Sequence, residues 1–555
     1  MKSIFKNTLA VLDTKEKNRF LLLICLDIII SIVDVLSLAL LLWIVQFYIQ
    51  PGNSYIPSFI PSWMSDHNSA WPIALFCIFF AVKNAAAFFI AKAYYKFNSD
   101  VAIRISYNNL SGYQQSNYDD FVNIDSSKHI RRICFQPFEF CQYILTGIQQ
   151  IITQSSLIII TVAAILIFNA KLFLLLLLIL LPPVIIVFYW MKKRMNLARQ
   201  NIRIHNQQSY RYLMDALKGW VESNIYKRHG FFLNRFIQSR KQFSNALFDS
   251  LALQNMPPRV IEVFAVLGLF VLILIAKSSA ATDESFLLTI GAFMAAAYKI
   301  IPGIVKITNQ SGQMKAYEFS ASDLINKNQP LHKDDAAING IRSVQLKNVY
   351  FSYNGYPVLD NFNLSIQPGD FIGITGVSGK GKTTILNVLL GFIEAAKGEL
   401  AINNSTLKNG EIKKAWPSIA YVRQQTFLIH DTLSRNITLE EEVVSKSTLE
   451  SAIKIAGLTE LISQSPEGCD KMITENGKNI SGGQQQRIAI ARALYKSADM
   501  ILLDEPFNEL DENAETALLE HCRKLAQQGK MIVLITHNKK SLAYCTKIIS
   551  LDGGE

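Results

Sequence analysis

A glycine-rich run in the second half of the chain has the residue types and spacing that hold a phosphate group. It follows the apolar segment Phe371–Thr375, a predicted strand, and opens a predicted helix at Thr383–Leu390. Glycines let backbone N–H groups wrap an anion, and the helix N-terminus adds the positive end of its dipole. The chemistry predicts that Lys382 reaches the β- and γ-phosphates of a nucleotide and that the Thr383 hydroxyl holds Mg²⁺. The predicted nucleotide contacts in this run are Gly376, Ser378, Gly379, Lys380, Gly381, Lys382, Thr383 and Thr384.

Two adjacent carboxylates follow further along the chain. Met500–Leu503 is a predicted buried strand, and Asp504 and Glu505 stand at its end. Such a pair by itself is often an ordinary strand end. Downstream of a phosphate loop, the same pair fits Mg²⁺ coordination and polarisation of an attacking water.

A second glycine-rich helix start lies between these two motifs. The octet Ile480–Arg487 reads Ile-Ser-Gly-Gly-Gln-Gln-Gln-Arg and precedes a predicted helix through Ala491–Tyr495. It is also suited to a phosphate. This octet resembles the signature motif of the ABC transporter family, and the other motifs of that family's ATP-binding cassette follow in order. The resemblance covers Ile341–Gly553 motif by motif, and the N-terminal part only through its number of spans and its loop lengths.

The resemblance assigns roles to residues that spacing alone does not. It implies that Tyr353 stacks on adenine, that Gln424 links Mg²⁺ to the membrane domain, and that His537 meets the γ-phosphate. The implied catalytic residues are Glu505, His537, Gln424, Lys382 and Asp504, the metal ligands are Thr383, Gln424 and Asp504, and the further nucleotide contacts are Tyr353, Ser481, Gly482, Gly483, Gln484 and Asp511. The loop Asn508-Glu509-Leu510-Asp511 departs from the family, in which the same positions usually read Ser-Ala-Leu-Asp. The contacts that this loop would make across the dimer are therefore in doubt.

The segments that must carry this cassette are strongly apolar. Half of the 555 residues are hydrophobic, which fits a membrane part joined to a soluble part. Six stretches are long enough to cross the ~30 Å hydrocarbon layer. They are Phe20–Phe47, Trp71–Tyr95, Ile144–Phe168, Phe173–Trp190, Val260–Ala276 and Phe286–Val305.

Positive charge predicts the orientation of these spans. Met191–Arg259 is rich in Lys and Arg, whereas the first hairpin loop, Gln50–Ala70, has neither. Cytoplasmic loops carry the excess of Lys and Arg, so both termini and the cassette are expected inside a bacterial inner membrane. The net charge of +11 has the same explanation, and we expect no nucleic-acid partner. The seven cysteines include no C-x-x-C pair, so we expect neither a zinc site nor a disulfide framework.

These features predict a multi-domain membrane protein: a six-helix all-α transmembrane domain (1–325), a linker (326–340) and an α/β P-loop NTPase cassette (341–555). The resemblance implies ATP and Mg²⁺ as cofactors and a second copy of the chain as partner, because the family sandwiches ATP between two cassettes. Short coupling helices are expected near Asn117–Asn123 and Ala216–Tyr226.

Two classes of function fit these features, and the intact catalytic residues and the in-span charges favour the first. The first is an ATP-driven exporter or flippase, working by alternating access, that moves a lipid-linked glycan, lipid or peptide-like substrate outward. The second is an ATP-driven regulator of a partner membrane protein. Three charges inside spans, Asp34, Lys83 and Lys299, are costly in lipid. They are expected either to border a polar cavity for a charged or glycosylated substrate or, for Asp34 and Lys83, to form a structural ion pair.

Overall fold

The chain folds into two compact units. One comprises Met1–Gln115 and Ile124–Leu331, and the other Ser116–Asn123 and His332–Glu555. The computed structural model describes residues 2–49, 69–116, 118, 122, 126–168, 182, 185, 186, 189, 201, 202, 204–278, 283–325, 338, 340–353, 355–407 and 410–552. The predicted outer loop Gln50–Ala70, the fourth span and the linker lie largely or wholly outside these residues.

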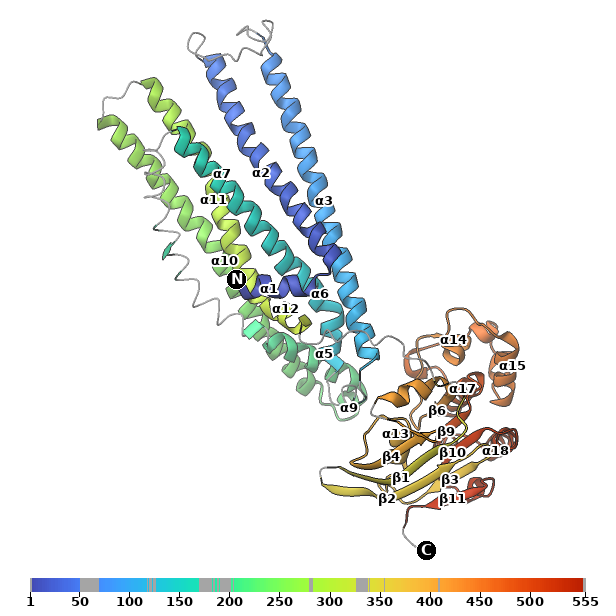
Figure 1. The fold of residues 1–555 in the computed structure, drawn as a ribbon. Helices are drawn as coiled ribbons and strands as arrows, with labels where there is room; N and C mark the ends of the chain where they lie inside the picture. The colour runs from blue at the N-terminus through green and yellow to red at the C-terminus, as the bar shows by residue number, and fades with distance from the viewer. Residues whose placement is uncertain are drawn as a thin grey trace. The chain divides into compact units, whose positions relative to one another are not determined.

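The first unit is helical, and its long helices run alongside one another (Figure 1). Two π-helical turns, η1 and η2, interrupt the stretch between α5 and α7. The helices are α1 (Lys2–Val11), α2 (Thr14–Ile49), α3 (Trp71–Gln114), α5 (Ser126–Ile130), η1 (Arg131–Phe135), α6 (Gln136–Glu139), η2 (Phe140–Leu145), α7 (Thr146–Phe168), α9 (Trp220–Ile225), α10 (His229–Ser278), α11 (Asp283–Ala316) and α12 (Glu318–Ile325).

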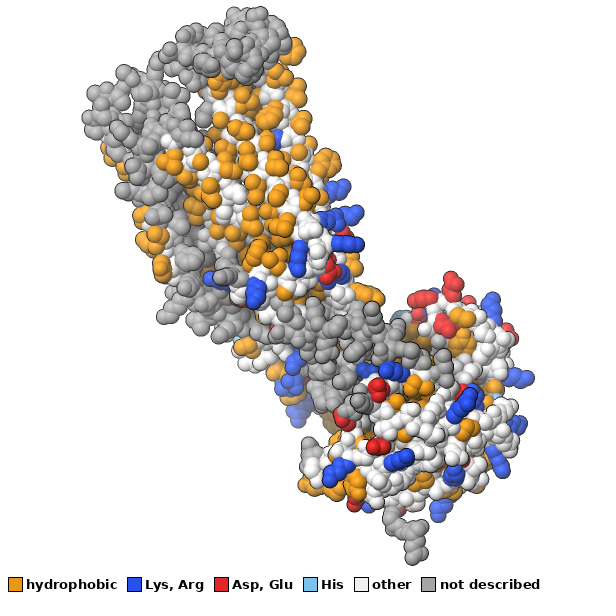
Figure 2. All heavy atoms as spheres, in the orientation of Figure 1, with side chains coloured by type: hydrophobic (Ala, Val, Ile, Leu, Met, Phe, Trp, Pro, Cys, Tyr) orange, Lys and Arg blue, Asp and Glu red, His pale blue; other side chains and the backbone are white. Residues whose placement is uncertain are grey.

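The first, second, third, fifth and sixth predicted spans fall within these helices wherever the structure describes them. Three apolar helical stretches are long enough to cross a membrane by length and composition: Thr14–Val45, Trp71–Gln114 and Ser127–Leu166. Their apolar windows are mostly exposed, as expected for side chains that face lipid. The predicted fifth and sixth spans lie inside α10 and α11. Figure 2 shows hydrophobic side chains along this unit, with Lys and Arg gathered toward one end.

The three in-span charges contact one another. Asp34 on α2 accepts hydrogen bonds from Lys83 on α3 and, at 2.7 Å, from Lys299 on α11. Lys83 is almost fully buried, while Asp34 and Lys299 are about a quarter exposed or less. This acid between two ammonium groups joins three helices that are far apart in sequence. The structure therefore contains the ion pair expected for Asp34 and Lys83, with Lys299 as an additional partner.

The second unit contains the cassette, built on two main sheets. Five parallel strands are ordered β11-β3-β10-β9-β6, and an antiparallel sheet is ordered β2-β1-β4-β5. The strands are β1 (Val344–Tyr353), β2 (Tyr356–Ile366), β3 (Phe371–Thr375), β4 (Lys397–Ile402), β5 (Ser405–Thr406), β6 (Ile419–Val422), β7 (Asp431–Thr432), β8 (Met472–Ile473), β9 (Met500–Asp504), β10 (Met531–Ile535) and β11 (Lys547–Ser550).

Two of the cassette's helices, α17 (Gly482–Tyr495) and α18 (Glu512–Gln527), contact strands of the parallel sheet. The three central strands β3, β9 and β10 are almost entirely buried apolar residues, as parallel strands packed on both faces usually are. The helices are α13 (Lys382–Leu389), η3 (Glu411–Ser418), α14 (Leu433–Thr438), α15 (Lys446–Ile455), α16 (Thr459–Ser463), η4 (Gly468–Asp470), η5 (Glu475–Gly477), α17 (Gly482–Tyr495), α18 (Glu512–Gln527) and α19 (Lys539–Leu542).

The short segment Ser116–Asn123, where a coupling helix was predicted, belongs to the cassette's unit. The ring of Tyr118 stacks on that of Phe392, with centroids 4.5 Å apart and planes 7° from parallel. The Lys413 ammonium donates to the Ser116 carbonyl oxygen at 3.3 Å. Ser116 and Tyr118, which follow α3 in sequence, are thus packed against the cassette residues Lys413 and Phe392.

Candidate nucleotide-binding site

The phosphate loop leaves the carboxyl end of β3 and enters α13. Its glycines adopt the backbone that other residues avoid: φ is +153° at Gly376, +86° at Gly379 and +90° at Gly381. A Cβ at Gly381 would lie 2.7 Å from the Val358 side chain on β2, so only glycine fits there. Ser378 and Lys380 are exposed on the loop, whereas Thr384 is buried in the first turn of α13.

Lys382 folds back over the loop that it belongs to. Its ammonium donates to the Gly376 and Val377 carbonyl oxygens at 2.6 and 3.1 Å, and its side chain is buried. The Val377 N–H is itself held at 2.6 Å by the Asp552 carboxylate, just beyond β11. The Lys382 ammonium and the Asp552 carboxylate therefore both hold the loop backbone. The buried cation at the centre of the loop makes a suitable environment for a phosphate.

Asp504 stands beside this loop at the end of β9. Its Oδ2 accepts from the Thr383 hydroxyl at 3.4 Å and from the Tyr421 hydroxyl at 3.5 Å. Burial, with the neighbouring Glu505 charge second, raises the pKa of Asp504, and the two hydroxyls oppose that shift only in part. Burial and the nearby Asp504 likewise raise the pKa of Tyr421, so its hydroxyl remains a donor. The structure thus brings together an unusually basic carboxylate and a hydroxyl, two hard oxygen ligands.

Glu505 is the centre of a small hydrogen-bond network. Its Oε2 accepts from Gln424 Nε2 at 2.9 Å and from Asn508 Nδ2 at 2.8 Å, and its Oε1 lies 3.2 Å from His537 Nε2. Its backbone is left-handed, with φ +50°, a strained conformation for a residue with a Cβ. The backbone and three donors together fix the carboxylate, as a group that positions a water requires.

The signature octet lies at a separate helix start. Ser481 caps α17 through a capping box with Gln484. Gly482 and Gly483 pack under the loop that precedes α18: a Cβ on Gly483 would lie 2.7 Å from the Glu509 carbonyl oxygen, and one on Gly482 would lie 3.0 Å from its carboxylate. Asp511 accepts from Arg487 at 2.8 Å. These residues border a cavity of about 470 Å³.

The predicted site residues therefore form two groups. One gathers the phosphate loop with Asp504, Glu505, Gln424 and His537; the other gathers Ser481–Gln484 with Asp511. Within the described residues, no hydrogen bond or ion pair joins the two groups. Tyr353 ends β1 half-exposed, with its ring 4.8 Å from that of Phe351, on the hairpin whose second strand packs against Gly381.

Three residues with a place in the first group were not among the predicted site residues: Asn508, Tyr421 and Asp552. Asp552 follows β11, which is the parallel neighbour of β3. Because the carboxyl ends of neighbouring parallel strands meet at one edge of a sheet, the position of Asp552 near the phosphate loop could have been predicted. Asn508 carried none, because its bond to Glu505 depends on the turn between β9 and α18.

The ABC transporter family model matches residues 359–508, which contain the phosphate loop, the signature octet and both carboxylates. The chain joins an ABC transporter ATP-binding domain to a membrane domain. Among solved structures, a bacterial Atm1-family ABC exporter with ATP bound matches 97% of this chain and 94% of its own, with a TM-score of 0.75 and 18% identity. The ABC exporter fold predicted from the sequence is therefore confirmed.

Curated ABC relatives are similar over shorter stretches. A probable ABC transporter ATP-binding/permease protein of Haemophilus influenzae is 28% identical over 62% of this chain and 63% of its own length. An ATP-dependent lipid A-core flippase of Photobacterium profundum is 32% identical over 53% of this chain and 52% of its own. The chain thus spans about half to three-fifths of the length of these relatives.

Asp504→Asn is expected to stabilise the protein while it impairs the site. Because the pKa of Asp504 is raised on folding, its ionised form costs folding free energy at every pH above the ordinary carboxyl range, and asparagine removes that cost. We expect a higher melting temperature without Mg²⁺ and an ATPase rate lower by about 10²-fold or more. Differential scanning fluorimetry and phosphate release measure the two effects.

Asp499→Asn is the matched control, since Asp499 directly precedes the same strand. Its carboxylate accepts from the Ile341 N–H at 3.1 Å and pairs with Lys530 at 3.4 Å, so its loss should lower the melting temperature. Equal shifts of the same sign in the two variants would contradict the electrostatic explanation.

Proposed function

We propose that the cassette binds and hydrolyses ATP with Mg²⁺. In this assignment the loop N–H groups and Lys382 hold the phosphates, Glu505 orients the attacking water, and His537 senses the γ-phosphate. The observation that carries the proposal is the Glu505 carboxylate, held by Gln424, Asn508 and His537 at the strand end that also carries Asp504. On the family resemblance, we assign Tyr353 as the adenine-stacking ring.

The ligand chemistry of the site fits Mg²⁺. Thr383, Asp504 and Gln424 offer a hydroxyl, a carboxylate and an amide, all hard oxygen ligands. Among the described residues no cluster of three or more His, Cys, Asp or Glu side chains could enclose a metal by itself. Mg²⁺ commonly keeps waters and takes phosphate oxygens as the remaining ligands, so a partial protein ligand set is what an ATP-bound Mg²⁺ needs.

We further infer that the working unit is a homodimer in which ATP lies between the phosphate loop of one copy and the Ser481–Gln484 helix end of the other. The separation of the two groups within one chain supports this arrangement. A second support is the exposed apolar surface at α9, where Leu217, Trp220, Ile225 and Tyr226 are each 65–70% exposed. A patch of this kind usually marks an interaction surface.

The proposed overall activity is ATP-driven export or flipping by alternating access, with the cassette and both termini in the cytoplasm. Closure of two cassettes on ATP would shift the helical units outward-facing, because ATP binds the closed state more tightly. The lipid A-core flippases among the relatives make a lipid-linked substrate the leading candidate, and membrane lipids the surroundings of the helices.

A mixed dimer tests the shared site. Lys382→Ala inactivates the phosphate loop, and Ser481→Arg inactivates the signature, so each variant alone should lose nearly all ATPase activity. Co-expressed with different tags and purified through both, the two variants form a mixed dimer with one intact composite site. We expect that dimer to recover ATPase activity toward half of the wild-type rate.

Each variant expressed by itself supplies its parent dimer as the control. A mixed dimer as inactive as its parents would contradict a site shared between copies. Activity in either parent dimer would contradict the assigned roles of Lys382 or Ser481.

A further inference from the structure

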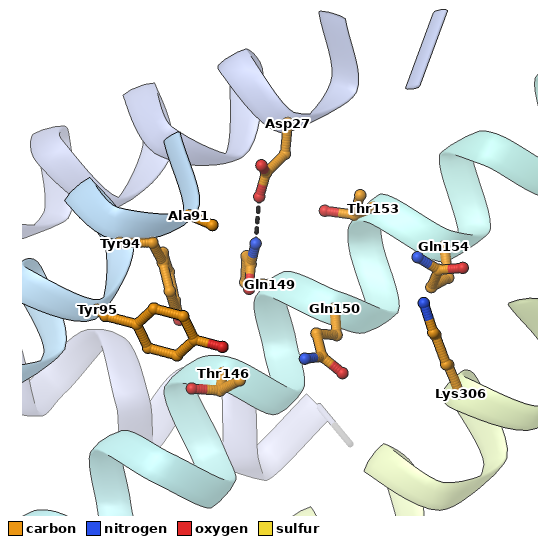
Figure 3. A pocket seen from close by; sticks show the side chains of 10 residues that line it. All are labelled: Asp27, Ala91, Tyr94, Tyr95, Thr146, Gln149, Gln150, Thr153, Gln154 and Lys306. Atoms are coloured by element: carbon orange, nitrogen blue, oxygen red, sulfur yellow. Dashed lines mark hydrogen bonds between the residues drawn. The ribbon is translucent and has the colours of Figure 1, made fainter. Parts of the chain in front are cut away.

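A polar cavity of about 180 Å³ lies among four helices of the membrane domain (Figure 3). It is bordered by Asp27 of α2, by Tyr94 and Tyr95 of α3, by residues of α7, and by Lys306 of α11. The α7 residues are two hydroxyls and three amides: Thr146, Gln149, Gln150, Thr153 and Gln154. For membrane helices whose spans are mostly hydrocarbon side chains, this concentration of donors and acceptors is unusual and costly.

Several of these polar atoms have unused hydrogen-bonding capacity. The Tyr94 side chain is only 3% exposed, and its hydroxyl lies beside Asn98 and Thr146 but makes no hydrogen bond of good geometry within the described part of the chain. The same holds for the Thr153 hydroxyl, which lies beside the Asp27 carboxylate. Gln149 donates to one oxygen of Asp27, which Figure 3 shows directed toward the cavity. Buried polar groups with poor hydrogen bonds destabilise the folded protein, so a polar occupant that bonds them would be favoured.

An acid of α2 and a lysine of α11 lie at matching heights at two levels of the membrane domain. The upper level contains Asp34 and Lys299, and the cavity lies at the lower level, which contains Asp27 and Lys306. On α2, Asp27 and Asp34 are seven residues apart, and on α11, which runs the other way, so are Lys299 and Lys306. Seven residues are about 10.5 Å, or two helical turns. At the upper level Asp34 contacts Lys299 at 2.7 Å. At the lower level, the described residues contain no ion pair between Asp27 and Lys306, and the cavity separates them.

We propose that this cavity binds a hydroxyl-rich headgroup that carries one negative charge, with hydroxyls against Asp27, Gln149 and Tyr94 and the charge beside Lys306. The proposal rests on the proposed export function and names the substrate class for it. Hydroxyls both donate and accept, which matches a mixture of carboxylate, amide and hydroxyl partners. Lys306 has no acidic partner among the described residues, so an anion there would gain a charge-assisted hydrogen bond.

Phosphatidylinositol is a suitable probe, because its headgroup is a hydroxyl-rich ring on a phosphodiester. The full-length protein, without ATP, is titrated with this lipid in phosphatidylcholine nanodiscs, and lipid bound per chain is counted by native mass spectrometry after release. Monoglucosyl-diacylglycerol supplies hydroxyls without charge, and phosphatidylglycerol supplies charge with fewer hydroxyls. We expect saturable binding of one phosphatidylinositol per chain, at least about tenfold tighter than either comparison lipid.

Three near-isosteric variants locate the binding. Tyr94→Phe, Gln149→Met and Lys306→Met should each weaken phosphatidylinositol binding about three- to tenfold, the range for one lost hydrogen bond or charge-assisted contact. Lys306→Met should also abolish the preference over the uncharged glucosyl lipid. The control is Thr161→Val on the same helix, whose hydroxyl already bonds the Leu157 carbonyl oxygen at 2.7 Å, and which should bind like the wild type.

Water-soluble glycerophosphoinositol, added in a separate titration, distinguishes a lipid headgroup from a free ligand of the same chemistry. Binding of either form at this site supports the proposal, and the tighter one identifies the source. Equal binding of phosphatidylcholine, or no effect of the three variants, would overturn it and leave water as the occupant. Because the readout uses no ATP, such a result is distinct from a failure of the mixed-dimer ATPase test.

Discussion

Glu505→Gln is expected to abolish ATP turnover while ATP binding is retained. The substitution keeps the shape of the side chain and removes the charge that would orient and polarise the attacking water. Removal of a positioned acid–base group typically lowers a rate about 10²- to 10⁴-fold. Phosphate release by the purified protein should fall by that factor, and retention of labelled ATP after desalting should rise.

The geometry explains why binding should persist. Oε2 of Glu505 accepts from both Gln424 and Asn508, and the glutamine carbonyl oxygen can take over both bonds. The new amide group then faces His537 Nε2, which accepts when the neutral ring carries its proton on Nδ1 instead. The network therefore survives without the carboxylate, and Lys382 and the phosphate loop are untouched. An ATP-bound dimer that cannot hydrolyse should accumulate in the closed state.

Glu520→Gln is the matched control, because it makes the same chemical change on the exposed face of α18. It should hydrolyse ATP like the wild type. Near-normal turnover in Glu505→Gln would mean that another group activates the water. Loss of ATP binding would mean that Glu505 serves the fold of the site instead.

The cassette could be predicted in detail because local physics and chemistry coincide there. The apolar run Phe371–Thr375 is β3, Met531–Ile535 is β10, and Met500–Leu503 extends by one residue as β9. In a parallel sheet the residues that follow such strands meet at one edge, so Gly376, Asp504 and His537 could be placed together from sequence.

The features of the site that were not predicted depend on the conformation of turns and on the orientation of side chains. The left-handed backbone of Glu505 and its bond to Asn508 are products of the β9–α18 turn, which carries no glycine to mark it. The packing of Glu509 against Gly482 was likewise not predicted. The loop sequence differs from the family's usual one, but that difference does not show which residue the Glu509 side chain contacts. Such contacts follow from the tertiary structure alone.

In the membrane domain, helices were predictable and their partners were not. Apolar length alone located α2, α3 and α7. The depth of Asp34, Lys83 and Lys299 in the membrane, counted along their spans, did not show whether they line a cavity or pair together. A helix can be rotated about its axis without changing the depth of its residues. The amides that line the cavity near Asp27 were not predicted for a related reason: Gln149, Gln150 and Gln154 are uncharged, and amides in a span attract less notice than charges.

Asp34→Asn is expected to be the most destabilising single change in the described spans. It leaves the ammonium groups of Lys83 and Lys299 adjacent, with no carboxylate between them, in a region of low dielectric. Breaking a buried ion pair by removing one partner commonly costs about 3–5 kcal/mol, because the remaining charge stays desolvated. Thermal unfolding in a lipid nanodisc should show a lower midpoint, and the yield of folded protein should fall.

Two comparisons separate this cause from a general intolerance of the spans to substitution. Asp100→Asn removes an acid whose ion pair with Arg19 is about half exposed on both sides, and exposed pairs contribute about 0–1 kcal/mol, so it should unfold like the wild type. Adding Lys83→Met and Lys299→Met to an Asp34→Leu change removes all three charges and should restore most of the lost stability, since apolar replacements of buried ion pairs are often neutral. If the triple variant is as unstable as Asp34→Asn alone, then shape and hydrogen bonding at this junction of α2, α3 and α11 matter more than charge. A stable triple variant that still hydrolyses ATP but no longer exports would show that the same charges serve the transport cycle rather than the fold.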